Sequence, residues 1–251
     1  MTTFITAYLK VYDEEYDMSR TFENRLKHFT YLLELGINIC IFIEPELEKK
    51  FNELGLKYDN LKVVQSIKIS ELELYKIGDN NPQLCNLPAN RNELKDTKNY
   101  IFLILAKLEF IKKTIDLNPY NSDYFCWLDF SLPYVFKDMN NTLSKIKKIS
   151  NTKIKQEFIY IPGCWNYKIN NINYLKNNIV WRFCGGFLIG DKKSLINFYN
   201  MSNDNFLKFL NETQTLVWEV NYWAWLEFVG LISPTWYLAD HNDTIVNVPY
   251  I

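Results

Sequence analysis

Residues 37–43 read Ile-Asn-Ile-Cys-Ile-Phe-Ile, and this almost continuous apolar run predicts a strand buried on both faces of a sheet. Before it, apolar residues recur at helical spacing over 20–35, and a strand-like run occupies 4–9. After it, Glu44-Pro45 starts a helix that extends to about residue 54, and 61–65 is a further strand. This alternation predicts parallel strands joined by crossover helices.

The rest of the chain continues to alternate. Residues 67–97 are less regular, and the stretch from Asp79 to Pro88 is expected to form a long loop, of the kind that often serves as a lid. Strands are predicted at 123–129, 158–161, 179–183, 187–190 and 232–238, and helices at 98–117, 192–209 and 212–228. The length of 251 residues and the lack of an internal repeat or a clear linker predict one domain, residues 1–251.

The charge balance argues against a nucleic-acid partner. The chain has 28 Lys and Arg against 29 Asp and Glu, and its formal net charge is -1. Proteins that bind nucleic acid usually carry a surplus of basic residues that displaces counterions from phosphates. The densest basic stretch, from Lys145 to Lys155, is interpreted as a solvated helix face or loop.

Cysteine usage and hydropathy predict a cytoplasmic location. The 5 cysteines form no C-x-x-C pair, and several lie in apolar runs where a thiol packs as a small hydrophobe. The first residues lack the basic and apolar regions of a signal peptide, and the longest apolar run, 100–106, is too short for a transmembrane segment.

Asp129 is the first candidate for chemistry. It follows the apolar run Phe125-Cys-Trp-Leu128, so it stands at the carboxyl end of a predicted buried strand. Ligands of open α/β sheets bind at this edge, and a carboxylate there can anchor a divalent cation that bridges to a diphosphate. The alternative is an acid that only caps a helix or forms a turn.

Further candidates lie in the second half of the chain. Gly185-Gly186 permits close approach of the backbone to a ligand, or forms a strand bulge. Glu212, Gln214 or Glu219 could act as the base that takes a proton from an acceptor hydroxyl, or as a polar group beneath a sugar. As an alternative, Glu212 is a charge favoured by the helix dipole.

This succession of elements resembles the GT-A glycosyltransferases, in which an acidic D-x-D element follows an apolar strand. More closely, the chain is similar to the HtrL/YibB family of candidate GT-A-fold glycosyltransferases. The segments that carry the resemblance are Thr6-Ala-Tyr8, Arg25, 100–107, Asn118-Pro119, 127–130 and 185–190. It covers most of the chain and implies an α/β fold: a GT-A-like (Rossmann-like) domain with a mixed, mostly parallel sheet flanked by helices.

The resemblance also implies roles for individual residues. Thr6, Ala7 and Tyr8 would line the nucleotide base and ribose, Arg25 and Lys107 would balance phosphate charge, and Gly185 and Gly186 would contact the donor sugar and acceptor.

A metal site is implied too, with one departure from the family pattern. Asp129 would bind Mn²⁺ or Mg²⁺, and His241 would be a late histidine ligand of the same ion. Ser131 stands where a full D-x-D element has its second acid, and a hydroxyl is the weaker ligand.

Three functions follow from these residues. The first is transfer of a sugar from a nucleotide-diphosphate sugar, with a UDP-sugar favoured, to a hydroxyl of a glycan, protein or small-molecule acceptor. The second is a sugar nucleotidyltransferase, against which the acidic stretch 13–17 counts, because that class usually has a basic, Gly-rich loop there. The third is a non-catalytic nucleotide- or carbohydrate-binding module. The chain contains neither G-x-x-x-x-G-K nor G-x-G-x-x-G.

Overall fold

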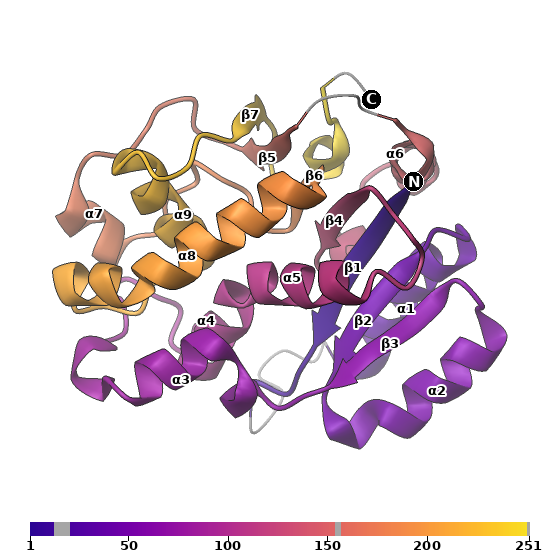
Figure 1. Cartoon of the computed structure of the whole chain (residues 1–251), viewed down its shortest axis with the longest axis horizontal. Coiled ribbons are helices and arrows are strands. Elements are labelled where there is room, and N and C mark those ends of the chain that lie inside the picture. The colour runs from indigo at the N-terminus through magenta and orange to yellow at the C-terminus, as the bar shows by residue number, and fades with distance from the viewer. Residues whose placement is uncertain (13–20, 154–156, 250–251) are drawn as a thin grey trace.

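A computed structural model describes residues 1–12, 21–153 and 157–249. These residues form a seven-stranded sheet in the order β3-β2-β1-β4-β6-β5-β7 (Figure 1). The strands are β1 (Thr2–Tyr8), β2 (Ile39–Ile43), β3 (Leu61–Ser66), β4 (Tyr124–Leu128), β5 (Ile159–Gly163), β6 (Phe187–Asp191) and β7 (Thr235–Leu238). The acidic stretch 13–17 lies outside the described residues.

The sheet is mixed and mostly parallel, as predicted. Strands β1 to β4 run parallel, whereas β6 runs antiparallel to both β4 and β5. Leu128 at the end of β4 therefore pairs with Phe187 at the start of β6, and the amide of Asp129 donates to the carbonyl of Gly186 at 3.0 Å. Two predicted segments, the strand-end acid and the glycine pair, meet at one edge for this reason.

Helices cover both faces of the sheet. A core that includes Phe110, Phe198 and Trp223 lies under one set, and a second core that includes Phe29, Phe51 and Ile146 lies under the other. The first set is α3 (Glu73–Asp79), α4 (Lys98–Leu105), α5 (Lys107–Leu117), α7 (Ile172–Asn177), α8 (Lys192–Thr213) and α9 (Glu219–Phe228). The second set is α1 (Phe22–Glu34), α2 (Glu48–Lys57) and α6 (Met139–Asn151). The described part of the chain holds no helix with the length and apolar character to cross a bilayer.

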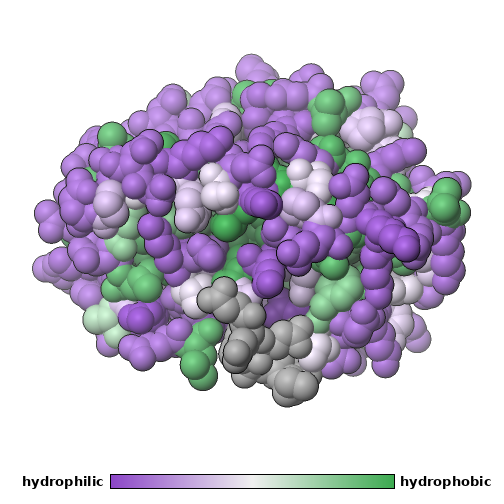
Figure 2. Space-filling model, turned by 90° about the horizontal axis from the view of Figure 1, so that it is seen from below, coloured by the Kyte–Doolittle hydropathy of each residue, from purple (hydrophilic) through white to green (hydrophobic). Residues whose placement is uncertain are grey.

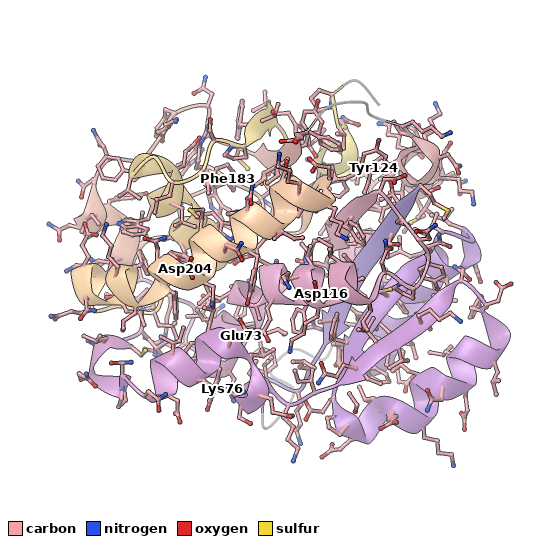
Figure 3. All side chains as sticks on the ribbon, in the orientation of Figure 1. Glu73, Lys76, Asp116, Tyr124, Phe183 and Asp204 are labelled. Carbon is pink, nitrogen blue, oxygen red and sulfur yellow. The ribbon has the colours of Figure 1, made fainter. Side chains whose placement is uncertain are left out.

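The irregular segment 67–97 contains more helix than its sequence indicates. A 3₁₀ turn at 69–71 and helix α3 lie before the predicted loop at 79–88, and that loop contains a second 3₁₀ turn at 82–84. Glu73 at the start of α3 (labelled in Figure 3) accepts a short hydrogen bond from the Tyr199 hydroxyl of α8, and its amide donates to Glu109 of α5 at 2.9 Å. Tertiary contacts thus order a segment whose local sequence is polar.

Three other boundaries differ from the predicted ones. Residues 179–183 are not a strand, although their backbone bonds to residues after β5. The helix predicted over 98–117 breaks at Ala106, which separates α4 from α5. The helix predicted to start at Glu212 starts at Glu219 instead, because α8 continues to Thr213 and Gln214 follows in the left-handed conformation with φ 52°. Gly36 ends α1 as predicted, with φ 61°.

The basic stretch around α6 is largely solvated, as expected, though residues 154–156 lie outside the described chain. Its start is held by Asp243, whose carboxylate accepts from the amides of Lys137 and Asp138 and from the Thr142 hydroxyl. Burial alone would raise the pKa of Asp243, but these hydrogen bonds lower it to about 2.

The low pKa of Asp243 predicts that part of the free energy of unfolding is lost at acidic pH. A carboxyl group whose folded pKa lies below its unfolded value stabilises the fold above about pH 4, and this contribution is lost as the pH falls toward 2. We expect the melting temperature of Asp243→Asn to fall below that of the unmodified protein at neutral pH by a few degrees, and the two to converge near pH 2. Thermal melts between pH 7 and 2 check this. A constant difference across the range would contradict it.

Candidate functional site

A cavity of about 650 Å³ opens at the edge where β1 and β4 end and β6 begins. Its volume lies within the usual range for small-molecule sites. Seen from that edge, the surface shows apolar side chains set back among hydrophilic ones (Figure 2). Aromatic residues line much of the cavity: Tyr8, Tyr12, Phe22, Tyr100, Trp127, Phe130, Tyr134, Trp181 and Trp218.

Lys107 is the central charged residue of the site. Its side chain is 2% exposed, and its ammonium lies 2.9 Å from Asp129 Oδ1 and 2.8 Å from Glu219 Oε1. It also donates to the carbonyl of Gly185 at 2.8 Å. An ammonium has three N–H donors, so these acceptors satisfy all of them.

The break between α4 and α5 brings Lys107 to this place. Ala106 has ψ near 1°, which ends α4 and leaves Lys107 as the first residue of α5. Burial alone would lower the pKa of Lys107, but the carboxylates of Asp129 and Glu219 raise it above its ordinary value. The side chain is therefore a buried ammonium ion that is fully paired.

Asp129 connects this buried ion pair to the cavity. Its Oδ1 accepts from the indole N–H of Trp127 at 2.7 Å and from Lys107, whereas the side chain as a whole is 44% exposed. Its Oδ2 lies on the side of Gly186. Ser131, two residues later, begins the 3₁₀ turn Leu132–Val135 and lines the same cavity.

Glycine at 185 leaves the space that the Glu219 carboxylate occupies. A Cβ atom at this position would overlap the Glu219 carboxylate and would lie 3.2 Å from Lys107 Nζ. Glu219 is 7% exposed and comes from the first turn of α9, where the helix dipole favours an acid. Gly185, just before β6, therefore packs directly against the carboxylate of Glu219 at the start of α9.

The cavity brings together most of the predicted residues and leaves three outside its lining. Thr6 is buried within β1 and does not line it. Glu212 is placed elsewhere, because its carboxylate accepts from the Trp225 indole at 3.1 Å, and Gln214 is the left-handed residue after α8. Those that line the cavity are Ala7, Tyr8, Arg25, Lys107, Asp129, Ser131, Gly185, Gly186, Glu219 and His241.

A family model described as "Bacterial protein of unknown function (HtrL_YibB)" matches residues 1–219. The chain belongs to this family. The membership predicted from the sequence is thereby confirmed. No curated protein matches the chain.

Two solved structures are similar to this HtrL/YibB member at low sequence identity. One is mouse xyloside xylosyltransferase 1 in its apo form, with 7% identity, a TM-score of 0.48, and coverage of 96% of this chain and 86% of that chain. The other is 4-diphosphocytidyl-2C-methyl-D-erythritol synthase from Anaerococcus prevotii, with 11% identity, a TM-score of 0.43, and coverage of 95% and 87%.

The donor set in this HtrL/YibB chain does not fit a Mn²⁺ or Mg²⁺ ion held by the protein alone. Such ions prefer several hard oxygen ligands. Asp129 offers a carboxylate whose Oδ1 already accepts from Lys107 and Trp127, and Ser131 offers a hydroxyl. His241 packs edge-on against Trp181, with ring centroids 4.4 Å apart, and lies near two thiols. A cation here would need oxygens from a ligand's own diphosphate and from water.

Sequence reasoning missed the role of Trp127 and treated it as an apolar strand residue. The signal was present, because residues two apart in a strand share a face, and Asp129 follows Trp127 by two. The burial of Lys107 had no comparable signal, since a lysine in a helical pattern is usually exposed.

Proposed function

We propose that the chain is a glycosyltransferase that moves a sugar from a nucleotide-diphosphate sugar, with a UDP-sugar favoured, to an acceptor hydroxyl. The observation that carries the proposal is the buried Lys107, which joins Asp129 and Glu219 at the wall of a cavity lined with aromatic side chains. Burying the charges of Lys107 and Glu219 is costly, so an ion-pair network at a ligand-sized cavity favours a functional role over a merely structural one.

The donor nucleotide is assigned to the end of β1. Ala7 and Tyr8 line the cavity there, and the Tyr8 ring packs 5.0 Å from Phe22 and 4.9 Å from Phe130. Aromatic faces suit a planar base. Arg25 lines the same cavity and is suited to a phosphate group, because its planar guanidinium can donate two parallel hydrogen bonds.

Glu219 is assigned as the catalytic carboxylate. Lys107 donates to its Oε1, which fixes the position of the carboxylate at the wall of the cavity. In this role it takes the proton of the acceptor hydroxyl as the oxygen attacks the anomeric carbon, and the nucleotide diphosphate leaves with the electrons of the broken bond. Asp129 orients the donor, and Lys107 holds the Asp129 and Glu219 carboxylates in position. No step passes through a metal ion.

A ligand-induced stability shift tests the donor assignment. A nucleotide sugar at about a hundred times its dissociation constant should stabilise the fold by roughly 2.7 kcal/mol. We expect such a shift with one donor from a panel of UDP-, GDP- and CDP-sugars, each measured with and without Mn²⁺. Asp129→Asn should lose the shift. Asp123→Asn, which changes an exposed acid at the other end of the β4 segment, should keep it.

Each outcome of this measurement discriminates between the candidate functions. A shift accompanied by release of free nucleotide diphosphate when an acceptor is added supports the transferase. A shift without turnover on any acceptor favours a binding module, and formation of pyrophosphate favours a nucleotidyltransferase. An equal shift in Asp129→Asn would contradict the assignment of the site.

A further inference from the structure

Three chain segments converge beside the cavity, at the far side from β1. They follow β5, precede β6 and follow β7, and backbone hydrogen bonds join them. The Cys164 amide donates to Trp181 at 3.0 Å, and the Cys184 amide donates to Pro162 at 2.7 Å. The Ala239 amide donates to the carbonyl of Gly163 at 2.9 Å, which ties the third segment to the same place. Side chains on these segments are therefore held in fixed relative positions.

Two thiols and an imidazole meet where the segments join. Cys164 Sγ lies 3.6 Å from Cys184 Sγ, and a ring nitrogen of His241 lies within 4.8 Å of both sulfur atoms. Cys184 is buried, Cys164 is half-buried, and the His241 side chain is 41% exposed. Cys184 thus lies at the buried end of the cluster, and His241 lies at the exposed end, through which an ion can enter.

We propose that Cys164, Cys184 and His241 form a binding site for Zn²⁺. Two Zn–S bonds of 2.3 Å at the tetrahedral angle place their sulfur atoms about 3.8 Å apart. The two thiols already stand at nearly that separation, 3.6 Å. Thiolate and imidazole ligands suit Zn²⁺, whereas Mg²⁺ and Mn²⁺ prefer oxygen. The site therefore differs from the hard-cation site predicted at Asp129, Ser131 and His241.

Asp240 is assigned as the fourth ligand of the proposed site. Its Oδ1 lies 3.7 Å from Cys164 Sγ and 3.5 Å from His241 Nδ1. Corner-to-corner distances of about 3.3 to 3.6 Å are expected between an oxygen ligand and its sulfur and nitrogen neighbours around Zn²⁺. The carboxylate is exposed and belongs to the residue before His241, so its side chain is free to turn toward the ion. The proposal does not depend on the proposed glycosyltransferase activity, because it concerns only these four side chains.

Cobalt binding tests the site without an activity assay. The full chain, purified under reducing conditions and stripped of metal, is titrated with Co²⁺ in an anaerobic cuvette. We expect one Co²⁺ per chain, with the near-ultraviolet charge-transfer band of a cobalt–thiolate bond and the intense visible bands of a tetrahedral ion. Added Zn²⁺ should abolish both signals.

Variants locate the ion. Cys164→Ser and His241→Ala change partly exposed side chains, so both should fold, and each should weaken binding at least tenfold. Asp240→Asn should weaken it less. Cys85→Ser is the matched control, since this half-buried thiol lies elsewhere and donates to the Gly78 carbonyl.

Three results would overturn the proposal. The first is the absence of a thiolate band, and the second is equal binding by Cys164→Ser and the unmodified chain. The third is a Cys164–Cys184 disulfide in air combined with no metal uptake after reduction, which would make the pair a redox pair instead.

Discussion

Replacing Lys107 with methionine is expected to remove donor binding and to destabilise the fold by about 3–5 kcal/mol, because two carboxylates then lose their buried counter-ion. For a chain of this size the melting temperature should fall on the order of 10 °C. Methionine keeps much of the volume of the lysine stem, so the effect reports the charge and its hydrogen bonds rather than a cavity. Thermal melts with and without the nucleotide sugar measure both losses.

Lys112→Met on the same helix is the control for this prediction. Lys112 pairs with Asp116 at the surface, and a surface pair of this kind contributes about 0–1 kcal/mol. A double variant tests whether the lost stability comes from the unpaired carboxylates or from general misfolding. Adding Glu219→Gln to Lys107→Met removes one of the unpaired carboxylates and should recover part of the lost stability. Equal melting temperatures for Lys107→Met and Lys112→Met would show that the buried cluster does not stabilise the fold.

Glu219→Gln is expected to lower turnover by about 10²- to 10⁴-fold, because an amide cannot accept the proton of the acceptor hydroxyl. The side chain keeps its size, and Lys107 keeps its contacts to Asp129 and to the Gly185 carbonyl. Donor binding should change little. Steady-state rates of nucleotide diphosphate release, together with the donor-induced stability shift, distinguish the two effects.

Glu212→Gln is the matched control for catalysis. The sequence offered both acids as the base, but Glu212 contacts the Trp225 indole and does not line the cavity. Its turnover should stay close to that of the unmodified chain. Equal losses in the two variants, or a loss in Glu219→Gln that lies wholly in the Michaelis constant, would refute the role of Glu219 as the base.

Most of the sheet could be predicted from the sequence, because its strands are apolar runs bounded by turn residues. The strands at 37–43 and 61–65 and the helix that Gly36 ends were found close to their predicted positions. The errors fell where tertiary contacts override local pattern. Helix α3 sits in a polar segment that packs against α5 and α8, and residues 179–183 look strand-like but only extend the backbone pairing beyond β5.

Some site residues could be predicted from the sequence and others could not, and the difference depends on which element positions each residue. Asp129 and Gly186 are strand-end residues, so the position of their strands places them. Lys107 and Glu219 depend on where helices break and begin, and the sequence predicted both of those boundaries wrongly. A shift of seven residues in the start of α9 decides which acid reaches the cavity.

The antiparallel β6 makes the order of synthesis matter. Strands β1 to β3 and the helices between them are complete once residue 66 has been made, so this first quarter of the chain can begin to fold while the rest is still being synthesised. One edge of β4 pairs with β1, and its other edge stays unpaired until β6 has been synthesised. Asp129 is translated 90 residues before Glu219, a delay of roughly 5–20 s at the usual rates of synthesis. During that interval Lys107 has only one of its two carboxylates, and the apolar edge of β4 is open to other nascent chains.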